Sequence, residues 1–181
     1  MRPARSPASF VAMADRPVLV VGLGNPVLGD DAVGWRVVDA VEERLATDSE
    51  AAAAAGPVEV DHLCAGGLRL MERVVGYDRV VVADAVLGPD LPGTVWSRPL
   101  AMVVSGRMGH LDSSHDASLT AALAAGRALG VGLPDDITIV GVAVARTDTF
   151  AERLTPPVEA AVPRAAEAIV SLLRARTGLV G

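Results

Sequence analysis

The chain contains a single cysteine, Cys64, so an internal disulfide and a metal site built from several thiolates are excluded. Positive charge is also scarce, because 16 lysine and arginine residues stand against 22 acids, for a net charge of −6. Nucleic-acid-binding proteins present a basic surface to the phosphate backbone, so we expect no nucleic-acid partner. Charged residues interrupt every hydrophobic stretch before the roughly 20 residues that cross a bilayer, so we expect no membrane partner.

The N-terminal segment MRPARSPASFVAMAD lacks the long apolar stretch of a secretory signal peptide. We therefore expect residues 1–16 to form a flexible extension of a cytoplasmic protein. The remaining residues, 17–181, suit one α/β domain, since this length supports a hydrophobic core without disulfides or metals.

Hydrophobic residues nevertheless make up 51% of the sequence, mostly as alanine and valine, while aromatic residues reach only 3%. This composition is typical of a buried parallel sheet covered by alanine-rich helices. Five runs predict strands: residues 17–22, 58–63, 79–85, 94–98 and 137–144. The fourth run follows a PDLPG turn and continues into Pro99, which predicts an edge strand.

Segments with helical spacing separate these strands. They cover residues 31–46, 68–75 and 115–129. A last helix opens with Thr155-Pro156-Pro157, an N-cap followed by prolines, and runs to about residue 174, with Pro163 kinking it or delaying its start. The alanine tract 51–56 is expected to prolong or fray the first helix, and residues 100–114 show no period. Strands that alternate with helices predict a mostly parallel, doubly wound sheet.

The segment GLGNPVLGDD, residues 22–31, joins the first predicted strand to the first predicted helix. The dinucleotide pattern G-x-G-x-x-G fails, because Val27 stands where the third glycine belongs. The phosphate-loop pattern has its spacing at Gly24 and Gly29, but Asp30 and Asp31 replace the lysine and the magnesium-binding hydroxyl. Two carboxylates would repel a triphosphate, so the loop favours a cation over a phosphate.

Neighbouring residues of a helix point in different directions, so the two aspartates are expected to differ in role. We expect Asp30 to cap the helix and Asp31 to face the cleft beyond the strand ends. Asp84 closes the apolar run RVVVADAV, and His115 begins a helix after the irregular segment. Asp31, Asp84 and His115 would form an O,O,N donor set, which suits zinc, nickel or iron. Alone, Asp84 also fits a turn residue and His115 a structural histidine.

Four segments occur in order: GLGNPVLGDDAVG, RVVVADAV, SSH before a predicted helix, and LTPPVEAAV. With them, the chain from Val18 to Leu173 resembles the hydrogenase maturation endopeptidases. The resemblance implies a three-layer α/β sandwich of the phosphorylase/hydrolase-like type, with a twisted, mostly parallel five-stranded sheet between helices. It also implies a peptidase that removes the C-terminal extension of a nickel–iron hydrogenase large-subunit precursor after nickel has been inserted.

The family's three metal-contacting positions fall on Asp31, Asp84 and His115. The resemblance implies that they recognise nickel supplied by the precursor, so the enzyme need hold no metal of its own, and that Asp31 and Asp84 are catalytic. The sequence departs from the family pattern where Ala32 replaces a frequent glycine and where Cys64 and Ala65 precede Gly66. Residues 102–112 match no family segment, which leaves the choice of hydrogenase open.

Two mechanisms of peptide hydrolysis remain open at this stage: metal-assisted activation of water and carbonyl, or an aspartate acting as general base. Two other classes of protein also remain. Peptidyl-tRNA hydrolases share the GLGNP opening, but they carry a tyrosine and a histidine soon afterwards, which GDDAVGWRVV does not supply. A non-catalytic nucleotide-binding module would use the glycine loop and leave Asp84 and His115 without a role.

Overall fold

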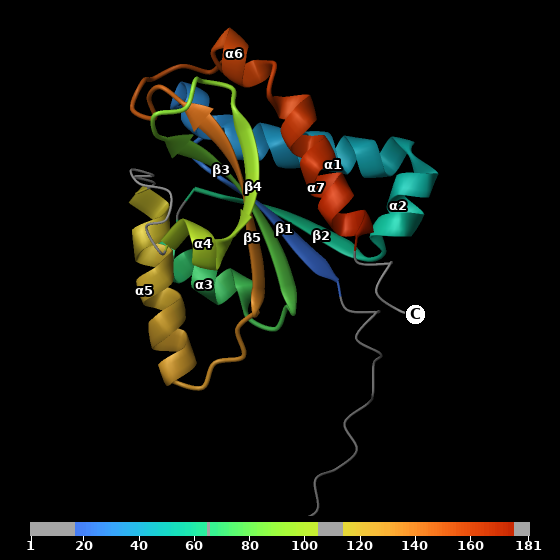
Figure 1. Cartoon of the computed structure of the whole chain (residues 1–181), viewed down its shortest axis with the longest axis vertical. Coiled ribbons are helices and arrows are strands. Elements are labelled where there is room, and N and C mark those ends of the chain that lie inside the picture. The colour runs from blue at the N-terminus through green and yellow to red at the C-terminus, as the bar shows by residue number, and fades with distance from the viewer. Residues whose placement is uncertain (1–16, 65, 105–113, 176–181) are drawn as a thin grey trace, which may run out of the picture.

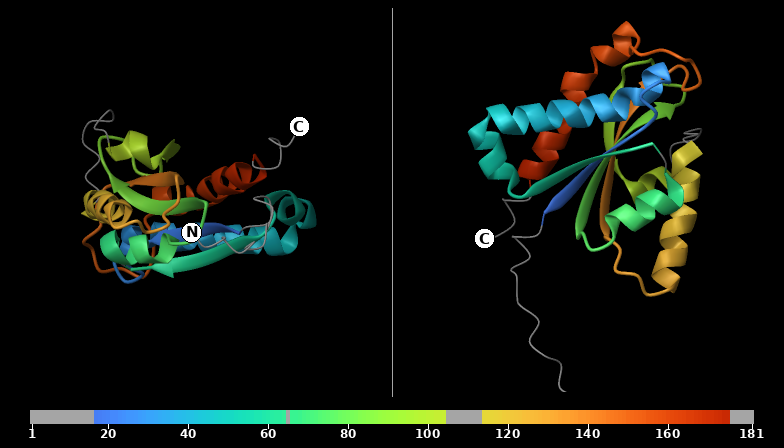
Figure 2. Two further views of the ribbon diagram at one scale, coloured as in Figure 1. Left: turned by 90° about the horizontal axis from the view of Figure 1, so that it is seen from below. Right: turned by 180° about the vertical axis from the view of Figure 1, so that it is seen from behind.

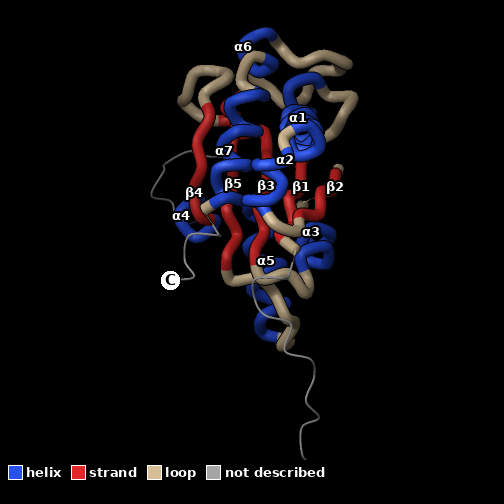
Figure 3. The backbone as a smooth tube through the Cα atoms, turned by 90° about the vertical axis from the view of Figure 1, so that its right-hand side faces the viewer, coloured by secondary structure: helices blue, strands red, loops and turns tan. Residues whose placement is uncertain are grey.

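The computed structural model describes residues 17–64, 66–104 and 114–175. A five-stranded sheet in the order β2-β1-β3-β5-β4 forms its centre (Figures 1 and 3). The strands are β1 (Val18–Leu23), β2 (Val58–Leu63), β3 (Arg79–Leu87), β4 (Val95–Pro99) and β5 (Asp136–Val144). All neighbours are parallel except β4, which pairs antiparallel with β5. The predicted fold class and all five strands are confirmed.

Burial explains the composition of the strands. Every residue of β1 is buried, and β3 and β5 are buried along nearly their whole length, as their charge-free valine and isoleucine runs predict. The outer strands β2 and β4 are only partly buried. Pro99 ends the edge strand β4, where its missing N–H costs no hydrogen bond to a further strand.

Helices cover both faces of the sheet (Figures 1 and 2). One core contains α1 (Val33–Thr47), α2 (Ser49–Ala55), α6 (Pro156–Glu159) and α7 (Val162–Arg174) on one side of the sheet. The other core contains α3 (Gly67–Val74), α4 (Leu100–Val104) and α5 (Ser114–Ala128). Alternate residues of each central strand belong to alternate cores, as the two-residue period of a strand requires.

Several element boundaries differ from the prediction. The alanine tract forms a separate helix, α2, because the Asp48 carboxylate accepts a hydrogen bond from the Ala51 amide and starts a new helix there. The last predicted helix is divided into α6 and α7, and Pro163 stands in the first turn of α7, so the predicted effect of this proline is confirmed. Residues 100–104 of the expected irregular segment form α4.

No helix in the described part of the chain is long and apolar enough to cross a membrane. The predicted extension, residues 1–16, lies outside the described residues. The division of the chain into this extension and one domain, residues 17–181, therefore stays a prediction.

Candidate functional site

The region outside the carboxyl ends of β1 and β3, hereafter the crevice, is the topological switch point of the sheet. The chain leaves β1 towards β2 on one side and β3 towards β5 on the other, so the topology reverses between these two strands. The pairing of β1 with β3 ends at Gly22 and Ala83, while β3 continues beside β5 as far as Leu87. Open α/β sheets bind ligands at such a reversal, outside the strand ends.

Two glycines allow the start of the first helix to approach this crevice. A Cβ atom at Gly34 would overlap the carbonyl oxygen of Leu23, at the end of β1, and that of Ala83, where the pairing of β3 with β1 ends. A Cβ atom at Gly24 would overlap the carbonyl oxygen of Asp31, and Gly24 has a φ of 136° that side chains disfavour. Because these positions lack side chains, the 3-10 helix η2 (Gly29–Ala32) packs against β3.

Asp31 lies in η2 and is 7% exposed. Its Oδ2 atom accepts a hydrogen bond of 2.7 Å from the amide of Asn25, across the glycine turn. In a phosphate-binding loop the amides of such a turn point at the ligand. Here the loop amides bind acceptors of the chain itself, as seen at residues Gly24, Asn25, Val27, Leu28, Gly29 and Asp31. The loop therefore offers these amides to no phosphate.

Asp30 does not cap the first helix, so this prediction is wrong. Its carboxylate accepts two hydrogen bonds from Thr155, of 2.6 Å from the amide and 2.8 Å from the hydroxyl. The chain enters α1 through η2, which places Asp30 inside the turn instead of before it. Thr155 is the N-cap residue of α6, as predicted. Its hydroxyl, however, donates to the Asp30 carboxylate and makes no capping hydrogen bond with the helix. No local sequence pattern predicts this pairing.

Asp84 is the most deeply buried acid among the described residues, at 1% exposure. It lies inside β3 and not at its end, because β5 pairs with three further residues, to Leu87. Val80 and Val82 pack in the core beneath α3, α4 and α5, and the two-residue period of the strand puts Asp84 on that same face. Asp84 therefore faces the side of the sheet that α5 covers.

Position 115 is the second residue of α5, and its helix begins at the carboxyl edge of the sheet (Figure 1). Leu119 and Leu123 of this helix pack on the sheet, and position 115 is one turn before Leu119 on the same helical face. The side chain of His115 lies outside the described residues. Among side chains that the structure describes, no group of three His, Cys, Asp or Glu residues is arranged to hold a metal ion.

Of the other two histidines, the structure describes only His62. His62 of β2 lies 2.8 Å from the Asp39 carboxylate and meets the Trp35 ring edge-on, so it has a structural role. His110 lies outside the described residues. The exposed Cys64 follows β2 directly.

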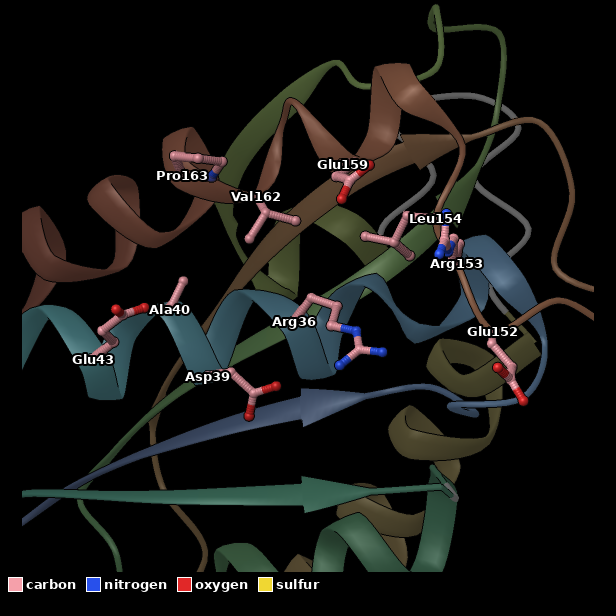
Figure 4. A pocket seen from close by; sticks show the side chains of 10 residues that line it. All are labelled: Arg36, Asp39, Ala40, Glu43, Glu152, Arg153, Leu154, Glu159, Val162 and Pro163. Carbon is pink, nitrogen blue, oxygen red and sulfur yellow. The ribbon is translucent and has the colours of Figure 1, made fainter.

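A shallow groove of about 560 Å³ lies between α1 and the segment that leads through α6 into α7 (Figure 4). Neither Asp31 nor Asp84 lines it. Its wall carries four acids and two arginines around a few apolar side chains: Arg36, Asp39, Ala40, Glu43, Glu152, Arg153, Leu154, Glu159, Val162 and Pro163. The groove is thus separate from the acidic crevice, although the segment before α6 lines the groove with residues 152–154 and binds Asp30, the neighbour of Asp31, through Thr155.

The fold and the crevice define an α/β protein with two buried carboxylates where its sheet topology reverses. The family model for hydrogenase maturation proteases matches residues 35–172, a span that begins after Asp31. The chain is 30% identical over 163 residues to the Hydrogenase 2 maturation protease of Escherichia coli (strain K12), covering 87% of this chain and 90% of that protein. The chain belongs to the hydrogenase maturation protease family, and it is a peptidase.

Solved structures agree with this assignment. The hydrogenase maturating endopeptidase HybD from E. coli is 29% identical, with a TM-score of 0.66 over 90% of this chain and 94% of that chain. The [NiFe] hydrogenase maturation protease HybD from Thermococcus kodakarensis, at 23% identity, shares the fold with a TM-score of 0.62, over 87% of this chain and 99% of that chain. The protease interpretation of the glycine loop is therefore favoured over the tRNA hydrolase and nucleotide-binding alternatives.

Proposed function

We propose that this peptidase removes the C-terminal extension of a nickel–iron hydrogenase large-subunit precursor after nickel has been inserted. Membership of the maturation protease family supports the reaction class. One protein with the same fold, from T. kodakarensis, is a [NiFe] hydrogenase maturation protease, which supports the kind of hydrogenase. The precursor is then both the substrate and the principal partner of this chain.

We assign the chemistry to Asp31 and Asp84, and recognition of the nickel to these two residues together with His115. The observation that supports this assignment is that Asp31 and Asp84 are both buried and belong to two elements in contact, η2 and β3. The register of α5 supports the third member, since position 115 shares a helical face with Leu119 and Leu123. Two carboxylates and one imidazole suit a borderline divalent ion, and leave coordination positions for the ligands that the precursor brings.

The low exposure of both aspartates strengthens their attraction for a cation, because little water screens them. Nickel that arrives with the precursor would polarise the carbonyl of the bond to be cut. Asp31 or Asp84, acting as general base, would take a proton from the attacking water and later return it to the leaving amine. The contribution of a general base can be measured from the pH dependence of kcat, because protonation of that base lowers kcat as the pH falls.

Purified large-subunit precursor, prepared with and without nickel, provides the direct test of this function. Incubation with the wild-type chain should shorten only the nickel-loaded form, and mass spectrometry of the product would locate the cut near its C-terminus. A precursor that keeps its full mass in both preparations would contradict the proposal.

A further inference from the structure

Two large hydrophobic side chains are exposed beside the candidate site. Phe150, in the segment that follows β5, is 84% exposed, and Val27, in the glycine loop, is 49% exposed. The chain has only two phenylalanines and 3% aromatic residues, so one of its few large aromatic side chains lies in solvent. Isolated exposed hydrophobics are ordinary, but neighbours at a functional edge are a feature of interaction surfaces.

Backbone contacts hold these two residues next to each other. Leu28 and Ala151, the residues that follow them, form a parallel β-bridge. The Gly29 amide donates to the Ala151 carbonyl at 2.8 Å, and the Ala151 amide donates to the Val27 carbonyl at 3.2 Å. These backbone hydrogen bonds therefore hold together two segments that lie far apart in the sequence, and they keep the exposed residues Val27 and Phe150 next to each other.

The same segments carry the candidate catalytic region. Asp31 binds the Asn25 amide within the loop of Val27, and Asp30 binds Thr155 at the end of the segment that contains Phe150. A protein chain that reaches the crevice between β1 and β3 must pass this edge of the sheet.

We propose that Val27 and Phe150, hereafter the docking pair, receive an apolar segment of the hydrogenase large-subunit precursor beside the bond that is cut. This inference rests on the proposed function. An open, strongly exposed pair cannot enclose a small ligand, whereas a protein can cover both side chains at once. Rigid aromatic side chains that a partner buries supply much of the binding free energy of protein interfaces, and bracing lowers the entropy lost on binding. The docking pair therefore controls substrate affinity and not the chemical step.

Initial rates of cleavage of the full-length, nickel-loaded precursor, measured over a range of precursor concentrations, test this inference. The variants are Phe150→Ser and the double variant Val27→Ser/Phe150→Ser. Leu129→Ser is the matched control, since Leu129 is 83% exposed but follows α5 at the opposite edge of the sheet. We expect KM to rise about tenfold for the double variant, with kcat within about twofold of wild type, and no change for Leu129→Ser.

The outcomes separate the docking inference from the proposed function. A double variant that cuts the precursor with the wild-type KM would overturn the inference while leaving the function intact. A double variant that alters self-association on a gel-filtration column, with KM unchanged, would assign the surface to a second copy of this chain and would also overturn it. Failure of the wild-type chain to cut the precursor would instead contradict the proposed function itself.

Discussion

Thr155 donates two hydrogen bonds to the carboxylate of Asp30, although 125 residues separate the two in the sequence. The amide bond is 2.6 Å long and the hydroxyl bond is 2.8 Å long. These bonds tie the start of α6 to the turn that carries Asp31. Asp30 thus has a structural partner in a distant segment, whereas Asp31 accepts its hydrogen bond from Asn25 within the loop itself.

Removal of the Asp30 carboxylate should destabilise the fold. Asp30→Ala leaves the Thr155 amide without this acceptor, at a cost of about 1–3 kcal/mol in the free energy of unfolding, and Thr155→Val, which keeps the amide, should cost about 0.5–1.5 kcal/mol. Urea denaturation of both variants and of the double variant measures the coupling. The double variant should lose less than the sum of the two single losses. Fully additive losses would show that the two residues do not interact.

The close approach of α1 to the sheet depends on the absence of a side chain at Gly34. Gly34→Ala should destabilise the protein by at least about 3 kcal/mol or prevent folding, because the new Cβ would overlap backbone oxygens of β1 and β3 that cannot move independently. Gly132→Ala is the matched control, since no atom lies within 4 Å of a Cβ there. Thermal unfolding compares the two, and equal melting temperatures would contradict the described packing.

Much of the fold was predictable from the sequence, because the central strands are rich in valine and are buried on both faces. The extent of β3 was not predictable, since its last residues are ordered by pairing with β5 and not by their own propensity. The pairing of Asp30 with Thr155 was not predictable either, because it too depends on contacts that only the folded chain makes. A local pattern identifies an N-cap residue, whereas a bond across 125 residues exists only in the folded chain.

The ion pairs of Arg73 should make stability depend on pH. Arg73 donates hydrogen bonds to Glu59 and Asp61 of β2. A hydrogen bond from Tyr77, together with Arg73, lowers the pKa of Glu59. Burial acts to raise the pKa of Asp61, but the hydrogen bond from Arg73 outweighs it, and the net pKa is lowered.

Because both folded pKa values lie below the unfolded ones, the stabilisation is complete above about pH 5 and is lost as the acids protonate below about pH 4. Arg73→Met should therefore lower the urea midpoint clearly at pH 7 and much less at pH 3. Arg146→Met, which removes an exposed ion pair with Asp148, should change the midpoint little at either pH. An Arg73→Met effect that is the same at both pH values would contradict the ionic origin of this stabilisation.

The occupied amides of the glycine loop predict that nucleotides do not bind there. Millimolar ATP or NAD should shift the melting temperature by less than about 1 °C, since only a ligand that binds the folded state raises it. A saturable rise with either nucleotide would show that the loop rearranges to accept phosphate.

The assignment of the acidic crevice is tested most directly by the rate at which Asp84→Asn cleaves nickel-loaded precursor. The amide keeps the size of the side chain and removes its charge, and Asp135→Asn, an exposed acid near the opposite edge of the sheet, serves as the control. Cleavage by Asp84→Asn should fall by at least about 100-fold while its melting temperature stays close to that of wild type, and Asp135→Asn should retain full activity. Cleavage by Asp84→Asn at the wild-type rate would contradict the assignment.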